Sequence, residues 1–185
     1  MKLKKKKIFK NIKTILSRWG FSKQGIYQNS KGEWYLFSQI ILILLHLISP
    51  YPKIENIPFL LNILSIIIGL SVSFQGLIIV VKAFIDLGDN LTPLPFPMNE
   101  SNLIKNNSYK SSRHPLYKGT LFISLGICIF SLSLIHLFLL ISLAYILRTK
   151  ALKEEEMLKN KFPEYANYIK EVPAIIKNIK YLDWK

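Results

Sequence analysis

The chain has 185 residues, half of them hydrophobic, and a mean hydropathy of +0.27. Its formal net charge is +14, but the basic residues are separated by long apolar runs, so we expect no nucleic-acid partner. The single cysteine, Cys128, lies within an apolar run, which excludes a disulfide framework and a thiolate metal site. We therefore expect one domain without a bound metal.

The first part of the chain is strongly basic. Residues 1–33 hold ten Lys or Arg residues and a single acidic residue, Glu33. Residues 4–19 predict a basic, partly amphipathic helix, whose first lysines suit anionic lipid headgroups. We expect residues 1–33 to form a cytoplasmic arm.

Three runs contain no Asp, Glu, Lys or Arg, and they cover residues 35–50, 57–81 and 119–147. A helix needs about 20 apolar residues to cross a hydrocarbon core of about 30 Å. The first run is short, but Trp34 and Tyr51 flank it, and both residue types favour membrane interfaces. Residues 34–83 are therefore predicted to form two transmembrane helices.

The third run allows two interpretations. Its 29 residues would form a helix of about 43 Å, too long for one perpendicular span and too short for two full ones. A single tilted helix would place its two ends on opposite sides of the membrane. A helical hairpin that turns near residues 131–133 would return both ends to one side. Positive charge at both ends favours the hairpin, whereas the absence of Gly or Pro at the turn counts against it.

The orientation follows from the basic residues. Residues 82–118 carry five of them and residues 148–185 carry nine, whereas the link 51–56 carries only Lys53. Lys and Arg accumulate on the cytoplasmic side, so both termini and the segment 82–118 are predicted to be cytoplasmic. The predicted fold is an all-α, multi-pass integral membrane protein with about four transmembrane helices, the last two forming a hairpin.

Residues 86–118 are polar and too rich in proline for a continuous helix. Pro93, Pro95 and Pro97 alternate, which favours an extended or polyproline stretch. Long loops within compact domains are usually functional. This loop is therefore a candidate part of a site.

Two polar clusters bracket the third apolar run. In the first, residues 111–119 read SSRHPLYKG, and Pro115 suits the first position of a helix. Arg113 and His114 would then precede a helix N-terminus, whose free N–H groups favour an anion. The second cluster, residues 148–158, reads RTKALKEEEML. Ionisable groups where a helix leaves the bilayer are functional candidates, although lysines that only reach toward water are a structural alternative.

The order of these clusters resembles the isoprenylcysteine carboxyl methyltransferase and phospholipid methyltransferase-like family. The family pattern is read here at Leu103, Ile104, Tyr109, Arg113 to Gly119, Glu154, Glu155, Leu158, Phe162, Tyr165, Tyr168, Val172 and Pro173. The resemblance covers roughly residues 84–176. Asn107 and Pro163 stand where the family usually has glycine, and neither change removes a charged group.

The resemblance implies a methyltransferase that uses S-adenosylmethionine, with a cytoplasmic cofactor pocket in a catalytic region at residues 84–185. It implies cofactor contacts from Leu103, Ile104, Tyr109, His114, Pro115, Leu116, Tyr117 and Glu154. It implies catalytic roles for Arg113, His114 and Glu155, and acceptor binding by Lys150 and Arg148. The acceptor would be a lipid or a lipidated molecule that enters from the bilayer.

Two other functions remain open at this point. A membrane reductase of the sterol and steroid reductase type, which uses NADPH, resembles this family in fold, but generally carries an acidic residue where Gly119 stands. A non-enzymatic membrane scaffold would use the polar clusters only as interface anchors. The acceptor also stays open among a prenylcysteine carboxylate, a phospholipid amine, a quinone or isoprenoid hydroxyl and a small thiol.

The predicted orientation can be measured by cysteine labelling. Asn106→Cys and Lys185→Cys should both react with a membrane-impermeant maleimide only after the cytoplasmic face is exposed, because both positions lie in segments rich in basic residues. Labelling of the two positions from opposite sides would contradict the hairpin and a shared site.

Overall fold

The computed structural model describes residues 19–52, 57–98 and 100–184, and the described residues contain helices but no strand. The long helices are α3 (Glu33–Leu45), α4 (Phe59–Leu87), α5 (Pro115–Ser131) and α6 (Leu134–Lys161). Short elements are α2 (Lys23–Gln28), η1 (Gly88–Asn90), η2 (Asn107–Lys110) and α7 (Tyr165–Glu171). The predicted basic helix at residues 4–19 lies outside the described residues except for its last position.

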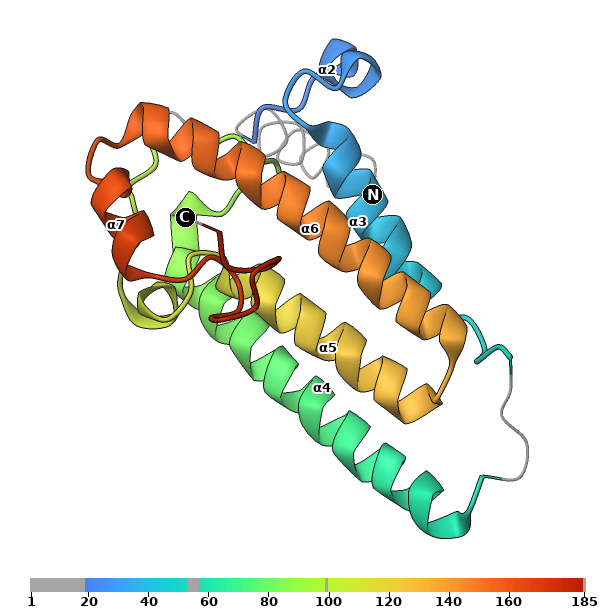
Figure 1. Cartoon of the computed structure of the whole chain (residues 1–185). Helices are drawn as coiled ribbons and strands as arrows, with labels where there is room; N and C mark the ends of the chain where they lie inside the picture. The colour runs from blue at the N-terminus through green and yellow to red at the C-terminus, as the bar shows by residue number, and fades with distance from the viewer. Residues whose placement is uncertain (1–18, 53–56, 99, 185) are drawn as a thin grey trace, which may run out of the picture.

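The four long helices lie side by side in the order α4, α5, α6 and α3 (Figure 1), and each packs on its neighbour in that order. The C-terminal segment after α7 folds back onto α5 and α6. Ile175 and Leu182 of this segment share an apolar core with Leu121, Leu143 and Leu147 of the two helices. The last residues of the chain are therefore part of the helical layer.

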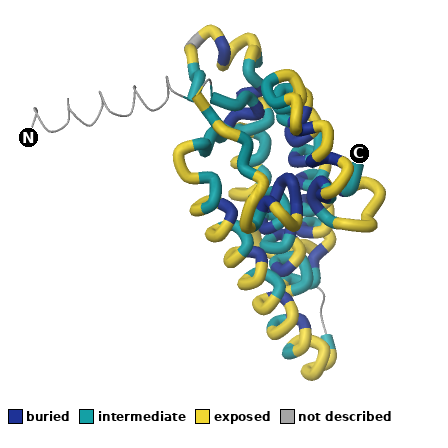
Figure 2. Tube along the Cα trace, turned by 90° about the vertical axis from the view of Figure 1, so that its left-hand side faces the viewer, coloured by how far each residue is buried: buried dark blue, intermediate teal, exposed yellow. Residues whose placement is uncertain are grey.

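Two helices, α4 and α6, are long and apolar enough to cross a membrane, whereas α3 and α5 are shorter apolar helices. Exposed positions recur along the outer sides of the helices (Figure 2). On α4 many of these are large and apolar, including Phe59, Leu60, Ile67, Leu70, Phe74, Leu77, Ile78, Val81, Phe84 and Ile85. An apolar surface of this extent requires an apolar solvent, which a lipid bilayer supplies.

Helix α4 packs on α5 through small residues. A Cβ atom on Gly69 would lie 2.6 Å from the carbonyl oxygen of Gly126, and one on Gly76 would lie 2.7 Å from that of Gly119. The two glycines of each helix are seven residues apart, which is close to two helical turns, so they meet as antiparallel pairs. Small residues let membrane helices approach until their backbones touch. The side of α4 that faces α5 therefore has room only for small residues, and the large side chains of α4 point outward.

The structure resolves the third apolar run as a hairpin, so the single tilted helix is wrong. Helix α5 ends at Ser131, and Leu132 takes left-handed backbone angles with φ 44° and ψ 47°. A non-glycine residue in this region costs about 1–3 kcal/mol. Hydrogen bonds at the turn offset that cost: Tyr51 N donates to Ser133 Oγ at 2.9 Å, and Ser133 Oγ donates to the Tyr51 carbonyl oxygen at 3.0 Å.

The first two predicted helices differ from the observed ones at their ends. Helix α3 stops at Leu45, before the end of the apolar run at residue 50. A helix cannot continue through Pro50, because the proline ring would clash with the carbonyl group of residue 46. His46 Nε2 lies 2.6 Å from Ser124 Oγ of α5, so this histidine joins two helices. Helix α4 continues to Leu87, beyond the predicted limit at residue 83.

Candidate functional site

The ends of the helices near the loop of residues 91–106 enclose a cavity of about 300 Å³, called here the main cavity. Small-molecule sites commonly measure about 300–1,000 Å³. Nine residues predicted from the sequence line it, namely Leu103, Ile104, Tyr109, Arg113, His114, Leu116, Tyr117, Lys150 and Glu154. They come from the loop, η2, the turn before α5, α5 itself and α6, so the fold brings together the two polar clusters that bracket the hairpin.

A buried ion pair lies behind the main cavity. Arg113 Nε donates to Glu155 Oε1 at 2.7 Å, and the two side chains are 0% and 3% exposed. The remaining donors of the guanidinium reach Glu155 Oε2 and the carbonyl oxygens of Ile169, Val172 and Trp184. All five N–H groups of Arg113 are thus engaged within the protein.

The C-terminal segment is tied to the same place. Backbone N–H groups of Arg113 and His114 donate to the carbonyl oxygens of Pro173 and Ala174 at 2.9 and 3.0 Å. Trp184 Nε1 donates to Glu155 Oε2 at 2.9 Å. The turn before α5, the C-terminal part of α6 and the C-terminal segment are therefore held as one unit.

His114 is oriented by this unit. Its Nε2 lies 3.0 Å from Glu155 Oε1, and since a carboxylate beside an arginine only accepts, Nε2 carries the proton. Nδ1 lies on the other side of the ring, 3.7 Å from Glu154 Oε2. The ring also stacks on Tyr117, with centroids 5.3 Å apart and planes 5° apart. Nδ1 is consequently the imidazole atom on the side of Glu154, which lines the main cavity.

Glu154 and Glu155 are adjacent in sequence but have different surroundings. Glu154 lines the main cavity with a side chain 31% exposed, and Tyr117 Oη donates to its Oε2 at 2.9 Å. Successive residues of a helix point about 100° apart, so Glu155 turns inward to Arg113. Glu154 thus presents a carboxylate to a ligand, whereas Glu155 is used by the protein.

Lys150 lies one turn before Glu154 and is only 3% exposed. Its Nζ donates to Gln39 Oε1 of α3 at 2.8 Å and lies 5.4 Å from the centroid of the Tyr117 ring. An ammonium group has three N–H donors. Lys150 is a buried cation that donates one hydrogen bond to a neutral amide, so it retains two N–H donors and a charge for an anionic group.

Three tyrosines form another wall of the main cavity. Tyr168 Oη donates to the Tyr109 carbonyl oxygen. Tyr165 is 1% exposed, and in the described part of the chain its hydroxyl has no hydrogen-bond partner. Burial, with the neighbouring Glu155 and Glu154 carboxylates, raises the pKa of the Tyr165 phenol, so it remains a donor. A buried donor without a partner costs about 1–3 kcal/mol, which a ligand can recover.

Three predicted site residues lie elsewhere. Pro115 lines a neighbouring cavity, and Glu155 is buried behind His114. Arg148 Nε donates to the Tyr181 carbonyl oxygen at 2.9 Å, and its guanidinium lies over the Tyr181 ring. The structure therefore does not bring Arg148 into the main cavity.

Several residues of the site were not predicted. Gln39 lies in an apolar run with no motif around it, and Trp184 is 29 residues from its partner Glu155. The family pattern includes Tyr165, Tyr168 and Leu158, which also line the cavity, but it did not indicate that the Tyr165 hydroxyl is buried without a hydrogen-bond partner among the described residues. The proline-rich stretch, which the sequence singled out as a candidate part of a site, contributes Pro93 and Pro97.

Comparison with known proteins identifies the class. The family model described as phospholipid methyltransferase matches residues 64–165, which is more than half of the chain. The chain belongs to the phospholipid methyltransferase family and is a membrane methyltransferase. The match begins within α4 and ends at Tyr165, so it contains both polar clusters. A search of curated proteins found no match.

The buried ion pair predicts a large effect of Glu155→Gln on stability. The substitution leaves the Arg113 guanidinium buried without a counter-charge, which should lower the free energy of unfolding by about 3–5 kcal/mol. Denaturation in detergent, followed by circular dichroism, measures the change. Glu156→Gln is the matched control, because its side chain is 57% exposed, and it should cost no more than about 0.5 kcal/mol. Equal stability of the two variants would contradict the role given to the pair.

Proposed function

We propose that this protein is an integral membrane methyltransferase that transfers the methyl group of S-adenosylmethionine to a lipophilic acceptor. In this proposal about four transmembrane helices carry the main cavity at their cytoplasmic end, and residues 84–185 form the catalytic region. The observation that carries it is that Glu154, a carboxylate facing the cavity, and Tyr165, whose hydroxyl has no hydrogen-bond partner among the described residues, line the same cavity.

The residues of the main cavity fit this cofactor. Glu154 would accept hydrogen bonds from its hydroxyl or amino groups, and Tyr165 would donate one. The rings of Tyr109 and Tyr117 would face its positive charge, since aromatic rings attract cations. Leu103 and Ile104 would supply an apolar wall. When bound, the cofactor supplies an electrophilic methyl group on a sulfonium.

The chain's own contribution is mainly positioning. Holding two reactants in line can contribute about 7–11 kcal/mol to lowering a barrier. Arg113 and Glu155 act here as positioning residues, because their polar atoms hold His114 and the C-terminal segment. His114 would present Nδ1, which can accept a proton from an acceptor that must lose one.

The acceptor proposal rests on Lys150 and the two outer helices. Lys150, with Gln39, would bind an anionic group of the acceptor, such as a phosphate or a carboxylate. Leu36 of α3 and Val80 of α4 line the same cavity from within the apolar parts of their helices. This composition supports entry of a lipid chain from the bilayer. A phospholipid amine, a prenylcysteine carboxylate and an isoprenoid are the acceptors of this kind.

Incubation of membranes with methyl-labelled cofactor and analysis of the labelled lipid identify which one is used.

Glu154→Gln should weaken cofactor binding while leaving the fold intact. Loss of a charged hydrogen-bond acceptor in a partly screened cavity should cost about 1.5–3 kcal/mol of binding free energy. This corresponds to a rise of about ten- to hundredfold in the Kd for S-adenosylmethionine or S-adenosylhomocysteine. Calorimetry on the purified protein in detergent measures it.

Two comparisons accompany that measurement. Glu156→Gln removes a charge two residues away on the exposed side of α6 and should leave the Kd unchanged. NADPH should not bind the wild type. Binding of NADPH instead of the methyl donor would favour a reductase, and an unchanged Kd in Glu154→Gln would remove this residue from the cofactor site.

Tyr165→Phe should have opposite effects on the empty and the bound protein. Removing a buried hydroxyl without a partner should leave the stability of the cofactor-free protein unchanged or raise it. Cofactor affinity should fall about fivefold, which corresponds to one lost hydrogen bond. Thermal unfolding and calorimetry on the same preparation give both values. A lower stability with unchanged affinity would mean that the hydroxyl serves the fold alone.

A further inference from the structure

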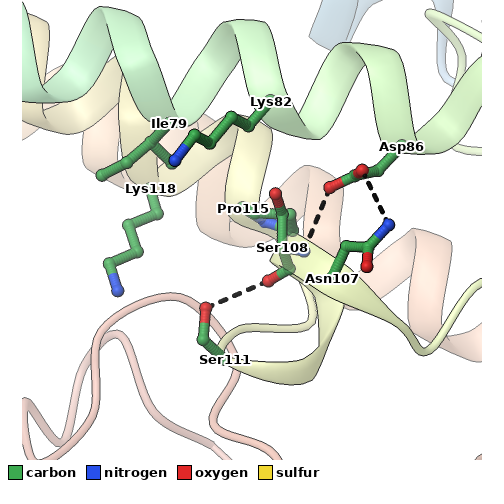
Figure 3. A pocket seen from close by; sticks show the side chains of 8 residues that line it. All are labelled: Ile79, Lys82, Asp86, Asn107, Ser108, Ser111, Pro115 and Lys118. Carbon is green, nitrogen blue, oxygen red and sulfur yellow. Dashed lines mark hydrogen bonds between the residues drawn. The ribbon is translucent and has the colours of Figure 1, made fainter.

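A second cavity, of about 430 Å³, lies on the other side of the turn before α5 (Figure 3). Pro115 lines this cavity, whereas its neighbours His114 and Leu116 line the main cavity. Ser108 likewise lines the second cavity, and the next residue, Tyr109, lines the main one. The two cavities are therefore separate sites that share a wall.

Two lysines from different helices line the second cavity, and we call it the lysine cavity. Lys82 comes from α4 and Lys118 from α5, and in Figure 3 both side chains extend away from Asp86. In the described part of the chain, no carboxylate lies within 4.0 Å of either amine. Neither amine thus forms a direct ion pair among these residues, and Lys82 interacts with the Asp86 carboxylate only at longer range.

The acidic residue of the lysine cavity is occupied by the neighbouring loop. Asp86 Oδ2 accepts from Ser108 N at 3.0 Å, and Oδ1 accepts from Asn107 Nδ2 at 3.1 Å. These bonds fix η2 to the end of α4. The two lysines outweigh this single acid, so the lining keeps a positive charge that an anion would complement.

The lysine cavity also has an apolar side. Ile79 lines it, and the neighbouring outward positions of α4, Ile78, Val81 and Ile85, are exposed apolar side chains. On a membrane helix these face hydrocarbon. A ligand here would therefore meet lysines and serine hydroxyls at one end and the lipid-facing side of α4 at the other. A phospholipid has this distribution of polar and apolar groups.

We propose that the lysine cavity binds the phosphate of an anionic phospholipid, with an acyl chain along the outer side of α4. Lys82 and Lys118 bind the phosphate oxygens, and Ser111, which is exposed and donates to the Ser108 carbonyl oxygen, lines the same cavity (Figure 3). This lipid is not the methyl acceptor, because the cavity is separated from His114 and Glu154 by the turn. The proposal is independent of the cofactor and acceptor given above.

Native mass spectrometry of the purified full chain tests this lipid site. The protein is exchanged into detergent with equal amounts of phosphatidylglycerol and phosphatidylcholine. The mass of the complex then identifies the lipid that the protein retains. One phosphatidylglycerol should be retained in preference to phosphatidylcholine. Lys82→Gln with Lys118→Gln should reduce its affinity about thirtyfold, since each lysine near a lipid surface contributes about a fivefold effect.

Matched variants distinguish loss of this lipid site from a general loss of positive charge. Lys177→Gln with Lys180→Gln removes the same charge from two exposed positions of the C-terminal segment and should retain the lipid. Lys82→Arg with Lys118→Arg keeps both charges and should also retain it, which controls for misfolding of the glutamine variant.

Three results would overturn the proposal. Equal retention of phosphatidylglycerol by the wild type and the Lys82 and Lys118 glutamine variant would remove the lysines from the site. Equal retention of both lipids by the wild type would show that the site does not prefer an anionic lipid. Displacement of the lipid by millimolar inorganic phosphate would assign the cavity to a free anion.

Discussion

The buried pair of Arg113 and Glu155 is the constraint on which the site depends. Burying two charges is costly, and the cost is met only when every donor and acceptor is satisfied. Here the arginine binds the carboxylate and three backbone carbonyl groups, and the carboxylate also receives His114 and Trp184. The pair therefore links segments far apart in sequence and fixes the imidazole at the edge of the main cavity.

The polar residues around the main cavity fall into two groups, those that bind one another and those that face the cavity. Residues that satisfy one another, such as Arg113 and Glu155, hold the protein together. Residues with unused capacity, such as Glu154, Lys150 and Tyr165, face the space that a ligand can fill. A neighbouring pair of glutamates thus takes different roles because a helix turns about 100° per residue. Membership of a methyltransferase family accords with a site that mainly orients reactants.

Sequence patterns indicated the helices and the two polar clusters, because both depend on local composition. The resemblance to the methyltransferase family also predicted nine of the residues that line the main cavity. Charge at both ends favoured the hairpin, but periodicity alone could not place its turn. Leu132 adopts left-handed angles there, and the adjacent Ser133 is hydrogen-bonded to Tyr51, 82 residues away in sequence. Gln39 and Trp184 could not be found for a similar reason. Each gains its role from one partner on another segment.

The glycine pairs between α4 and α5 have a mechanical consequence. Where two backbones touch, neither helix can rotate or slide by a fraction of a turn without driving a carbonyl oxygen into a side chain. Gly69, Gly76, Gly119 and Gly126 thereby set the phase of both helices. The rotation of each helix about its axis decides which cavity a side chain faces. It directs Val80 and Leu116 to the main cavity, and Lys82 and Lys118 to the lysine cavity. The four glycines thus fix how the two cavities are oriented relative to each other.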